Sequence, residues 1–84
     1  MTLQQLKYVI TVAAKGTISE AAKALFITQP SLTAAIKDLE AEFGIAIFNR
    51  TNKGVTPTPE GEEFLGYARQ IMEHTNLLEE RYGG

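Results

Sequence analysis

The side chains between Gln29 and Lys37 combine an amide, hydroxyl groups and an amine that could recognise another molecule. A Gln amide can pair with the edge of adenine, and a Ser or Thr hydroxyl can reach a base or a phosphate. In a helix beginning after Thr28, the apolar residues turn inward and leave outside the set Gln29, Pro30, Thr33, Ala34 and Lys37. This outer face suits the base edges and phosphates of a nucleic acid duplex. A capped amphipathic helix with a solvated polar face is the alternative, and this helix alone does not choose between them.

The elements that would position this face are two short helices joined by a tight turn, a helix-turn-helix pattern over about residues 18–37. Ser19 is the predicted N-cap of the first helix, because its hydroxyl can accept a backbone N–H of the first turn. We expect that helix to end before Phe26, and Thr28 to be the N-cap of the next one. Pro30 then falls in the first turn, where its missing N–H costs nothing. Gly44 ends the second helix, whose inward face follows the spacing of Leu32, Ala35, Ile36, Leu39 and Phe43.

A helix from Thr2 to Lys15 is predicted to complete a three-helix core. Thr2 can cap this helix, and Gly16 is a typical stop. Its apolar stripe consists of Leu3, Leu6, Val9, Ile10 and Ala13. We interpret this helix as scaffold for the two helices that follow.

A short basic hairpin is predicted after Gly44. The segment 45–48 is apolar and strand-like, 49–54 is polar and turn-rich, and 55–57 forms a second short strand. After a helix-turn-helix, such a hairpin makes a wing, from which Arg50 and Lys53 would approach phosphates or a minor groove. Taken by itself, an ordinary surface hairpin with solvated charges is the better interpretation.

The last segment predicts one long helix. Thr58 is its cap, Pro59 occupies its first position, and the helix runs to Tyr82, about 36 Å at ~1.5 Å per residue. Residues spaced alternately by four and three form a heptad seam, namely Phe64, Ala68, Ile71, Thr75, Leu78 and Tyr82. The seam is longer than the surface of so small a domain, so we predict a dimer helix. The alternative is a helix that packs back on its own domain, aided by Leu65 and Met72.

Composition sets further bounds on the 84 residues. The net charge is −2, but residues 1–58 hold six Lys or Arg and four acids, whereas residues 59–84 hold two Arg and six Glu. The absence of Cys from the sequence excludes disulfides. No apolar run reaches the ~20 residues of a membrane span, and no signal peptide is visible, so we expect a cytoplasmic protein without a membrane partner.

Features of an enzyme are missing from the sequence. The single His, His74, stands beside Glu73 on the long helix, with no arrangement that indicates catalysis. The turn at 52–54 lacks the spacing of a phosphate-binding loop. We therefore predict that the chain is not an enzyme and holds no metal.

About the first 66 residues resemble the N-terminal winged helix-turn-helix of LysR-type transcriptional regulators. The centre of the resemblance is the segment 28–32, Thr-Gln-Pro-Ser-Leu. The other matching positions, in order and without gaps, are Leu3, Leu6, Tyr8, Ala13, Gly16, Ala21, Ala22, Leu25, Ile36, Leu39, Glu40, Gly44, Phe48, Arg50, Val55, Thr58 and Gly61. The long helix is similar to the linker helix that pairs two subunits in that family.

The resemblance implies a bacterial regulator that binds promoter DNA, as a homodimer through the last helix and often as a tetramer. It also implies an effector domain that grips a small-molecule inducer, which would follow this chain, so we expect no cofactor in this fragment. Thr33 stands where the family commonly has Ser, and Ala34 where a basic residue is frequent. The predicted DNA-binding residues are Ser19, Thr28, Gln29, Pro30, Ser31, Thr33, Ala34, Lys37, Arg50 and Lys53.

The sequence thus predicts a mainly α fold: a winged helix-turn-helix domain, with a three-helix core and a two-stranded wing, over residues 1–58, then a linker or dimerisation helix over 59–84. Its predicted function is sequence-specific binding of double-stranded DNA, with the recognition helix in the major groove of an inverted-repeat site. The alternative is a winged-helix protein-interaction module or a coiled-coil assembly module that binds no DNA.

Overall fold

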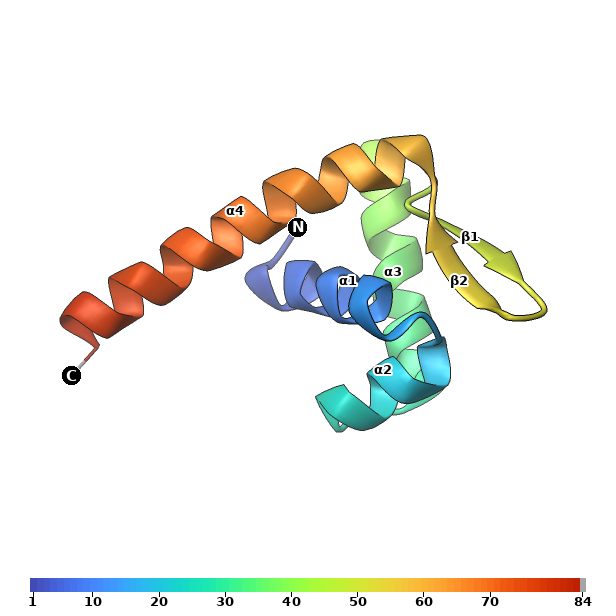
Figure 1. Ribbon diagram of the computed structural model, residues 1–84, viewed down its shortest axis with the longest axis horizontal. Coiled ribbons are helices and arrows are strands. Elements are labelled where there is room, and N and C mark those ends of the chain that lie inside the picture. Colours follow the sequence, from blue (N-terminus) through green and yellow to red (C-terminus); the bar gives the residue numbers. More distant parts are fainter. Residues whose placement is uncertain (84) are drawn as a thin grey trace.

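The computed structural model describes residues 1–83, which form four helices and one two-stranded sheet (Figure 1). Gly84, the last residue of the predicted linker segment, lies outside the described residues. The elements follow in the order α1 (Leu3–Lys15), α2 (Ile18–Leu25), α3 (Gln29–Phe43), β1 (Phe48–Thr51), β2 (Gly54–Pro57) and α4 (Pro59–Tyr82). The mainly helical winged helix-turn-helix prediction is confirmed.

The ends of α1 and α3 lie where local signals place them. The Thr2 side chain accepts a hydrogen bond from the Gln5 N–H, while the Gln5 side chain accepts one from the Thr2 N–H. The Thr28 hydroxyl accepts the Ser31 N–H at the start of α3. Gly16 and Gly44 end α1 and α3 with φ of 79° and 66°, left-handed values that Gly adopts without a steric cost.

The predicted cap of α2 is wrong by two residues. Thr17, not Ser19, is the N-cap: its backbone is extended, and its hydroxyl accepts the Glu20 N–H at 3.1 Å. Ser19 lies inside the first turn, because the earlier of the two hydroxyls already serves the free N–H groups of the helix. The helix ends at Leu25, and its C-cap is Phe26, whose φ of 58° is left-handed and whose side chain is 95% exposed.

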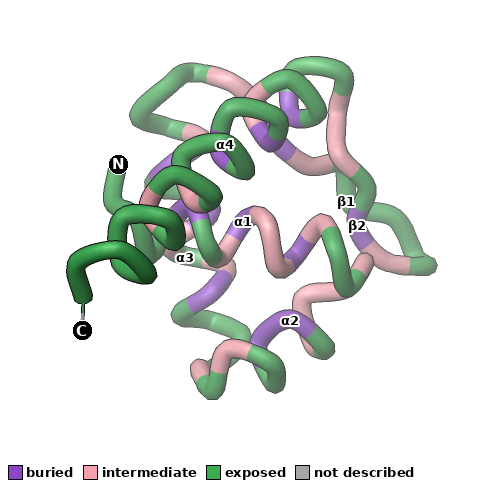
Figure 2. Tube along the Cα trace, turned by 60° about the vertical axis from the view of Figure 1, so that its left-hand side comes forward, coloured by how far each residue is buried: buried purple, intermediate pink, exposed green. Residues whose placement is uncertain are grey.

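The core lies between the three N-terminal helices, the start of α4 and one residue of the wing (Figure 2). Two predicted inward positions lie nearer the surface. Leu3, in the first turn of α1, is 48% exposed, whereas Val12, which the predicted stripe omits, is fully buried. Phe43 is half-exposed and packs its ring 5.5 Å from that of Phe64. The fully buried large side chains are Leu6, Val9, Val12, Leu32, Leu39, Ile47 and Leu65.

The first wing strand begins later than predicted, at Phe48 instead of Ile45. Its antiparallel pairing with β2 runs from Phe48 opposite Pro57 to Thr51 opposite Gly54. The segment 45–47 is not part of the strand. The Glu40 carboxylate accepts the Ile47 N–H, the Thr58 hydroxyl donates to the Ala46 carbonyl, and the Thr58 backbone N–H donates to the Ile47 carbonyl. Those contacts make 45–47 a fixed connection to the wing.

The two halves of α4 have different surroundings. The first turns pack on the domain through Gly61, Leu65 and Ala68, which are all buried. The second half runs past the other helices and is exposed along most of its length (Figures 1 and 2). Within residues 1–83, no helix has both the length and the apolar character needed to span a membrane.

Candidate nucleic-acid interface

The opening turns of α3 are free of the protein's own core. Leu32, Ile36 and Leu39 are buried on the inner face of the helix. The outer face forms one shallow depression in the surface, lined by Gln29, Pro30, Thr33, Ala34 and Lys37. The structure therefore gathers in one place the five outer residues that periodicity predicts, and their contact with DNA stays a prediction.

The hydroxyl groups beside this depression are partly used inside the protein. The Thr28 hydroxyl accepts the Ser31 N–H at 3.2 Å and donates its proton to the Ser31 hydroxyl oxygen at 2.8 Å. The two hydroxyls are thus bonded to each other, and either can donate its proton to the other. Ser19 is half-buried in the first turn of α2.

The depression is lined by a Lys and by no carboxylate. The three acids of α3 follow later in the helix, at Asp38, Glu40 and Glu42. Glu42 forms an ion pair with the N-terminal amino group of Met1, and Glu40 turns its carboxylate to the base of the wing. The Met1 amino group thus compensates the charge of Glu42, and Glu40 directs its carboxylate to neutral backbone N–H groups at the base of the wing.

The wing presents its two basic residues differently. Arg50 and Lys53 are both exposed. Arg50 stands opposite Val55 in the sheet and shares a small hollow with Lys37 and Glu40 of α3. Arg50 therefore lies at the junction between the wing and α3, whereas Lys53 lies at the turn between β1 and β2.

The wing is fastened to the domain through β2. The Val55 side chain is 8% exposed and belongs to the core, and the Val55 N–H donates to the carbonyl oxygen of Gly16 at 2.9 Å. A side chain on Gly54 would overlap that same oxygen. The close approach of β2 to the turn between α1 and α2 thus fixes the wing beside the helix-turn-helix.

Sequence reasoning missed the role of Glu40. Its carboxylate accepts the backbone N–H groups of Ile47 at 2.7 Å and Phe48 at 3.3 Å. The sequence does contain a signal for this role. An acid in the last turn of a helix is unfavourable with the helix dipole, so its presence there indicates a hydrogen-bond donor outside the helix. The partners themselves lie beyond the helix, in a segment predicted to be a strand.

The free apolar face of α4 is narrower than the predicted seam. Ala68 is 2% exposed within its own domain, and Phe64 packs on Phe43. These two residues are therefore not free to line a seam, because the domain covers the first turns of the helix. Ile71, Leu78 and Tyr82 stay exposed.

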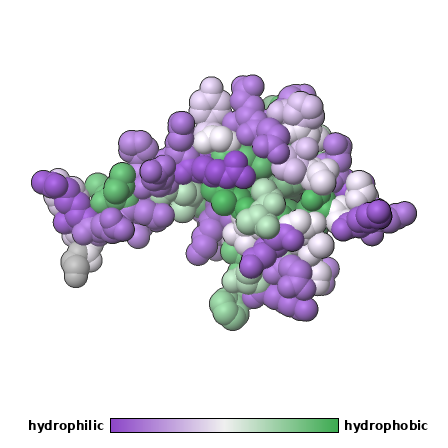
Figure 3. All heavy atoms as spheres, in the orientation of Figure 1, coloured by the Kyte–Doolittle hydropathy of each residue, from purple (hydrophilic) through white to green (hydrophobic). Residues whose placement is uncertain are grey.

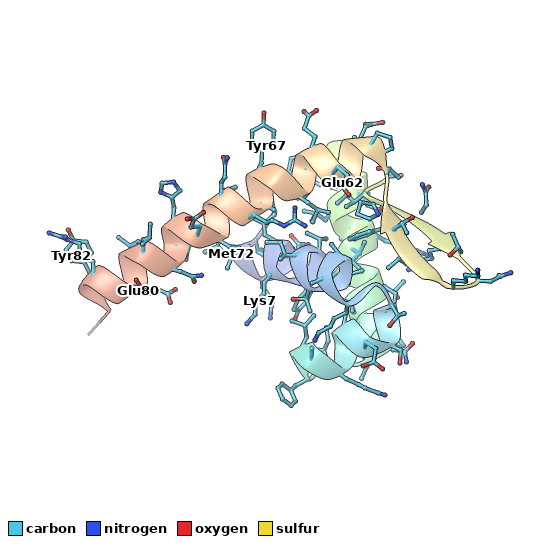
Figure 4. The ribbon with its side chains drawn as sticks, in the orientation of Figure 1. Lys7, Glu62, Tyr67, Met72, Glu80 and Tyr82 are labelled. Atoms are coloured by element: carbon cyan, nitrogen blue, oxygen red, sulfur yellow. The ribbon has the colours of Figure 1, made fainter. Side chains whose placement is uncertain are left out.

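The exposed side of α4 forms a second shallow depression, lined by Tyr67, Gln70, Ile71, His74, Thr75 and Leu78. Tyr67 points away from the domain, whereas Met72 lies on the side toward α1 (Figure 4). Hydrophobic atoms also show on the part of α4 that extends past the rest of the molecule (Figure 3). The first half of α4 thus packs on its own domain, the second half leaves an apolar face exposed, and the role of that face in a dimer stays a prediction.

Comparison with known proteins identifies the family to which this sequence is similar. Residues 3–62 match the model of the bacterial regulatory helix-turn-helix proteins of the lysR family. The HTH-type transcriptional regulator ClcR of Pseudomonas putida is 42% identical over 77 residues, which is 92% of this chain and 26% of the relative. The HTH-type transcriptional regulator CbbR of Rhizobium meliloti (strain 1021) is 44% identical over 80 residues, 95% of this chain and 26% of the relative.

Solved structures resemble the fold closely. The CbnR_DBD–DNA complex superposes with a TM-score of 0.91 at 38% identity, covering 96% of this chain and 93% of that one. The BenM_DBD complex with benA site 1 DNA has a TM-score of 0.89 at 35% identity, covering 93% of this chain and 91% of that one. Full-length CbnR, a LysR family transcriptional regulator, is covered over 28% of its length. The chain thus spans about a quarter of the length of the curated relatives it matches.

Proposed function

This chain belongs to the lysR family of bacterial regulatory helix-turn-helix proteins, and on that basis we propose that it binds double-stranded DNA as the DNA-binding domain of a transcriptional regulator. The observation that carries the proposal is the exposed, carboxylate-free face at the start of α3, with the basic wing beside it. Relatives with this fold are described in complex with DNA, which supports the same role here.

In the proposed complex, the start of α3 enters the major groove. The Gln29 amide pairs with a base edge, and Thr33 reaches a base or a phosphate. Ala34 is small enough to contact a thymine methyl group. Lys37 and the wing residues Arg50 and Lys53 contact phosphates or the adjacent minor groove, which positions the helix without reading sequence.

The whole protein is proposed to act as a regulator of promoters with inverted-repeat sites. Two copies joined through α4 would place their recognition helices on half-sites one helical turn, or a multiple of it, apart. An effector domain that binds a small-molecule inducer is proposed to follow α4 in the parent protein, because this chain matches only 26% of the length of its relatives.

Salt dependence tests the proposal directly. We expect the chain to bind a mixed-sequence duplex of about 40 base pairs, with an affinity that falls steeply as salt rises. Lys53→Ala should weaken binding to every sequence and reduce the slope of log K against log[salt] by roughly one, because one phosphate contact is lost. Fluorescence anisotropy at several salt concentrations measures both quantities.

Lys7→Ala is the matched control for this experiment, because Lys7 lines a groove between α1, the end of α2 and α4 that contains no residue of α3. It should leave the slope unchanged. Binding that does not respond to salt, or equal effects of the two Lys variants, would contradict the proposal and favour a protein-interaction module.

Dimerisation through the free face of α4 is a separate proposal. Leu78 is 60% exposed on that face, and Leu77 is 55% exposed on a different side of the same helix. We expect Leu78→Asp to weaken the dimer by about 100-fold, because a charge would enter an apolar contact. Sedimentation equilibrium measures the change.

Leu77→Asp changes the same residue type one position earlier and should leave the dimer intact. A wild-type chain that sediments as a monomer at all concentrations would refute the dimer proposal. A Leu77→Asp variant that dissociates as readily as Leu78→Asp would show that another face of α4 makes the contact.

A further inference from the structure

The connection between α3 and the wing, residues 44–47, is held by polar contacts on both of its sides. We call it the wing-base loop. It carries no residue of the proposed DNA-binding surface, and its one fully buried side chain is Ile47. The arrangement of its backbone hydrogen bonds nevertheless decides where the wing begins.

Glu40 binds the N–H groups of this region. Its backbone carbonyl accepts the N–H of Gly44 and that of Ile45, the latter at 3.2 Å. Its carboxylate oxygen Oε2 accepts the N–H of Ile47 at 2.7 Å and that of Phe48, the first residue of β1, at 3.3 Å. One residue of α3 therefore bonds four backbone donors that lead into the wing.

Thr58 binds the carbonyl groups on the other side. Its N–H donates to the carbonyl oxygen of Ile47 at 2.9 Å, and its hydroxyl donates to that of Ala46. The same hydroxyl accepts the Gly61 N–H and so caps α4. The Ile47 backbone is thus bonded to α3 through its N–H and to the start of α4 through its carbonyl.

We propose that Glu40 is a positioning residue, which sets the orientation of the wing relative to α3 and so brings Arg50 onto the DNA backbone without touching DNA itself. The inference rests on the proposed DNA-binding function. It follows from the length and acceptor geometry of the Glu40 side chain, because the single oxygen Oε2 receives both N–H groups.

The wing needs such a contact on its first strand. β2 is anchored by the buried Val55 and by its bond to Gly16, whereas β1 is half-buried at Phe48 and exposed at its other three residues. Apart from its pairing with β2, β1 is held at its base by Glu40. Arg50 lies two residues beyond that bond and shares a hollow with Glu40.

Two conservative variants of Glu40 separate the effect of side-chain length from the effect of charge. Glu40→Gln loses the charge but keeps an oxygen at the same distance from the backbone, so it can still accept both N–H groups. Glu40→Asp keeps the charge but is shorter by one methylene. We expect Glu40→Gln to bind DNA like the wild type and Glu40→Asp to bind about fivefold more weakly.

The coupling to the wing is measured by a double-mutant cycle with Arg50→Ala. In the wild type and in Glu40→Gln, Arg50→Ala should raise the dissociation constant about fivefold. In Glu40→Asp, it should change the constant less than twofold, because Arg50 is already displaced. The probe is a mixed-sequence duplex of about 40 base pairs, long enough for two half-sites, at a temperature where thermal melts show every variant folded.

Asp38→Ala is the control for removing a carboxylate from α3, since Asp38 is exposed on the same helix. It should leave the Arg50 effect at its wild-type size. The inference is overturned if Glu40→Asp behaves like the wild type, or if Arg50→Ala costs the same in every background. A wild-type chain that fails to bind the duplex would instead refute the proposed function, so the two failures are distinguishable.

Discussion

Gln29→Ala is expected to abolish most of the preference for particular sequences while leaving binding to other DNA nearly unchanged. Gln29 is exposed at the first position of α3, in a depression that contains no carboxylate. An amide that pairs with a base edge contributes about 1–3 kcal/mol of discrimination. The variant should therefore bind a site enriched from random duplexes by the wild type about 1–3 kcal/mol more weakly.

The measurement compares two titrations, one with the enriched site and one with a mixed-sequence duplex. Gln4→Ala is the matched control, because Gln4 lines the groove between α1 and α4. It should affect neither titration. If Gln29→Ala weakens both duplexes equally, or weakens neither, then the outer face of α3 does not read bases in the proposed way.

Gly61→Ala is expected to cause a large loss of stability. A Cβ at Gly61 would overlap the backbone carbonyl of Ile47, which cannot withdraw because it is bonded to Thr58. The first turn of α4 would have to separate from the wing-base loop and from the core that Leu65 fills. Overpacking of this kind costs about 1–3 kcal/mol, and more where backbone must move.

Urea denaturation followed by circular dichroism measures the change in the free energy of unfolding. Gly66→Ala is the control on the same helix, because an added Cβ at Gly66 meets open space. It should stabilise the protein by about 0.5–1 kcal/mol through the lower helix propensity of Gly. A Gly61→Ala variant as stable as the wild type would mean that α4 does not approach Ile47 so closely.

Local signals were sufficient for most helix boundaries. A hydroxyl that can accept a backbone N–H of the first turn identifies Thr2, Thr28 and Thr58 as N-caps. A Gly in the left-handed conformation marks the ends of α1 and α3. The start of α2 was misplaced because Thr17 and Ser19 both offer a capping hydroxyl within three residues. Only the backbone conformation, extended at Thr17, decides between them.

Features that depend on distant partners could not be predicted from the sequence. The apolar run at 45–47 has the composition of a strand, yet its hydrogen bonds go to Glu40 and Thr58, residues at the ends of two helices. Likewise, the heptad pattern of α4 does not reveal that the domain covers Ala68. Periodicity finds an apolar face but does not tell which surface lies against it.

The outer face of α3 is the part of the candidate site that the sequence predicted completely. Its five residues follow from the helix start and the inward spacing of Leu32, Ile36 and Leu39, both of which are local properties. The contacts of Glu40 could not be predicted from local patterns, because its carboxylate binds backbone N–H groups of the segment that follows the helix.

The continuity of α4 has a geometric consequence for a paired molecule. The helix begins after its cap Thr58, which is hydrogen-bonded to the wing-base loop, and continues to Tyr82 without interruption. It is therefore a stiff lever with the proposed DNA-binding surface at its first end. Adding one residue to such a lever advances it by ~1.5 Å and turns it by about 100°, since a helix has ~3.6 residues per turn. If two copies pair through α4, the point where the two helices cross therefore sets the spacing and relative rotation of their proposed DNA-binding surfaces along a duplex. A small shift at that crossing would move both surfaces through a large arc.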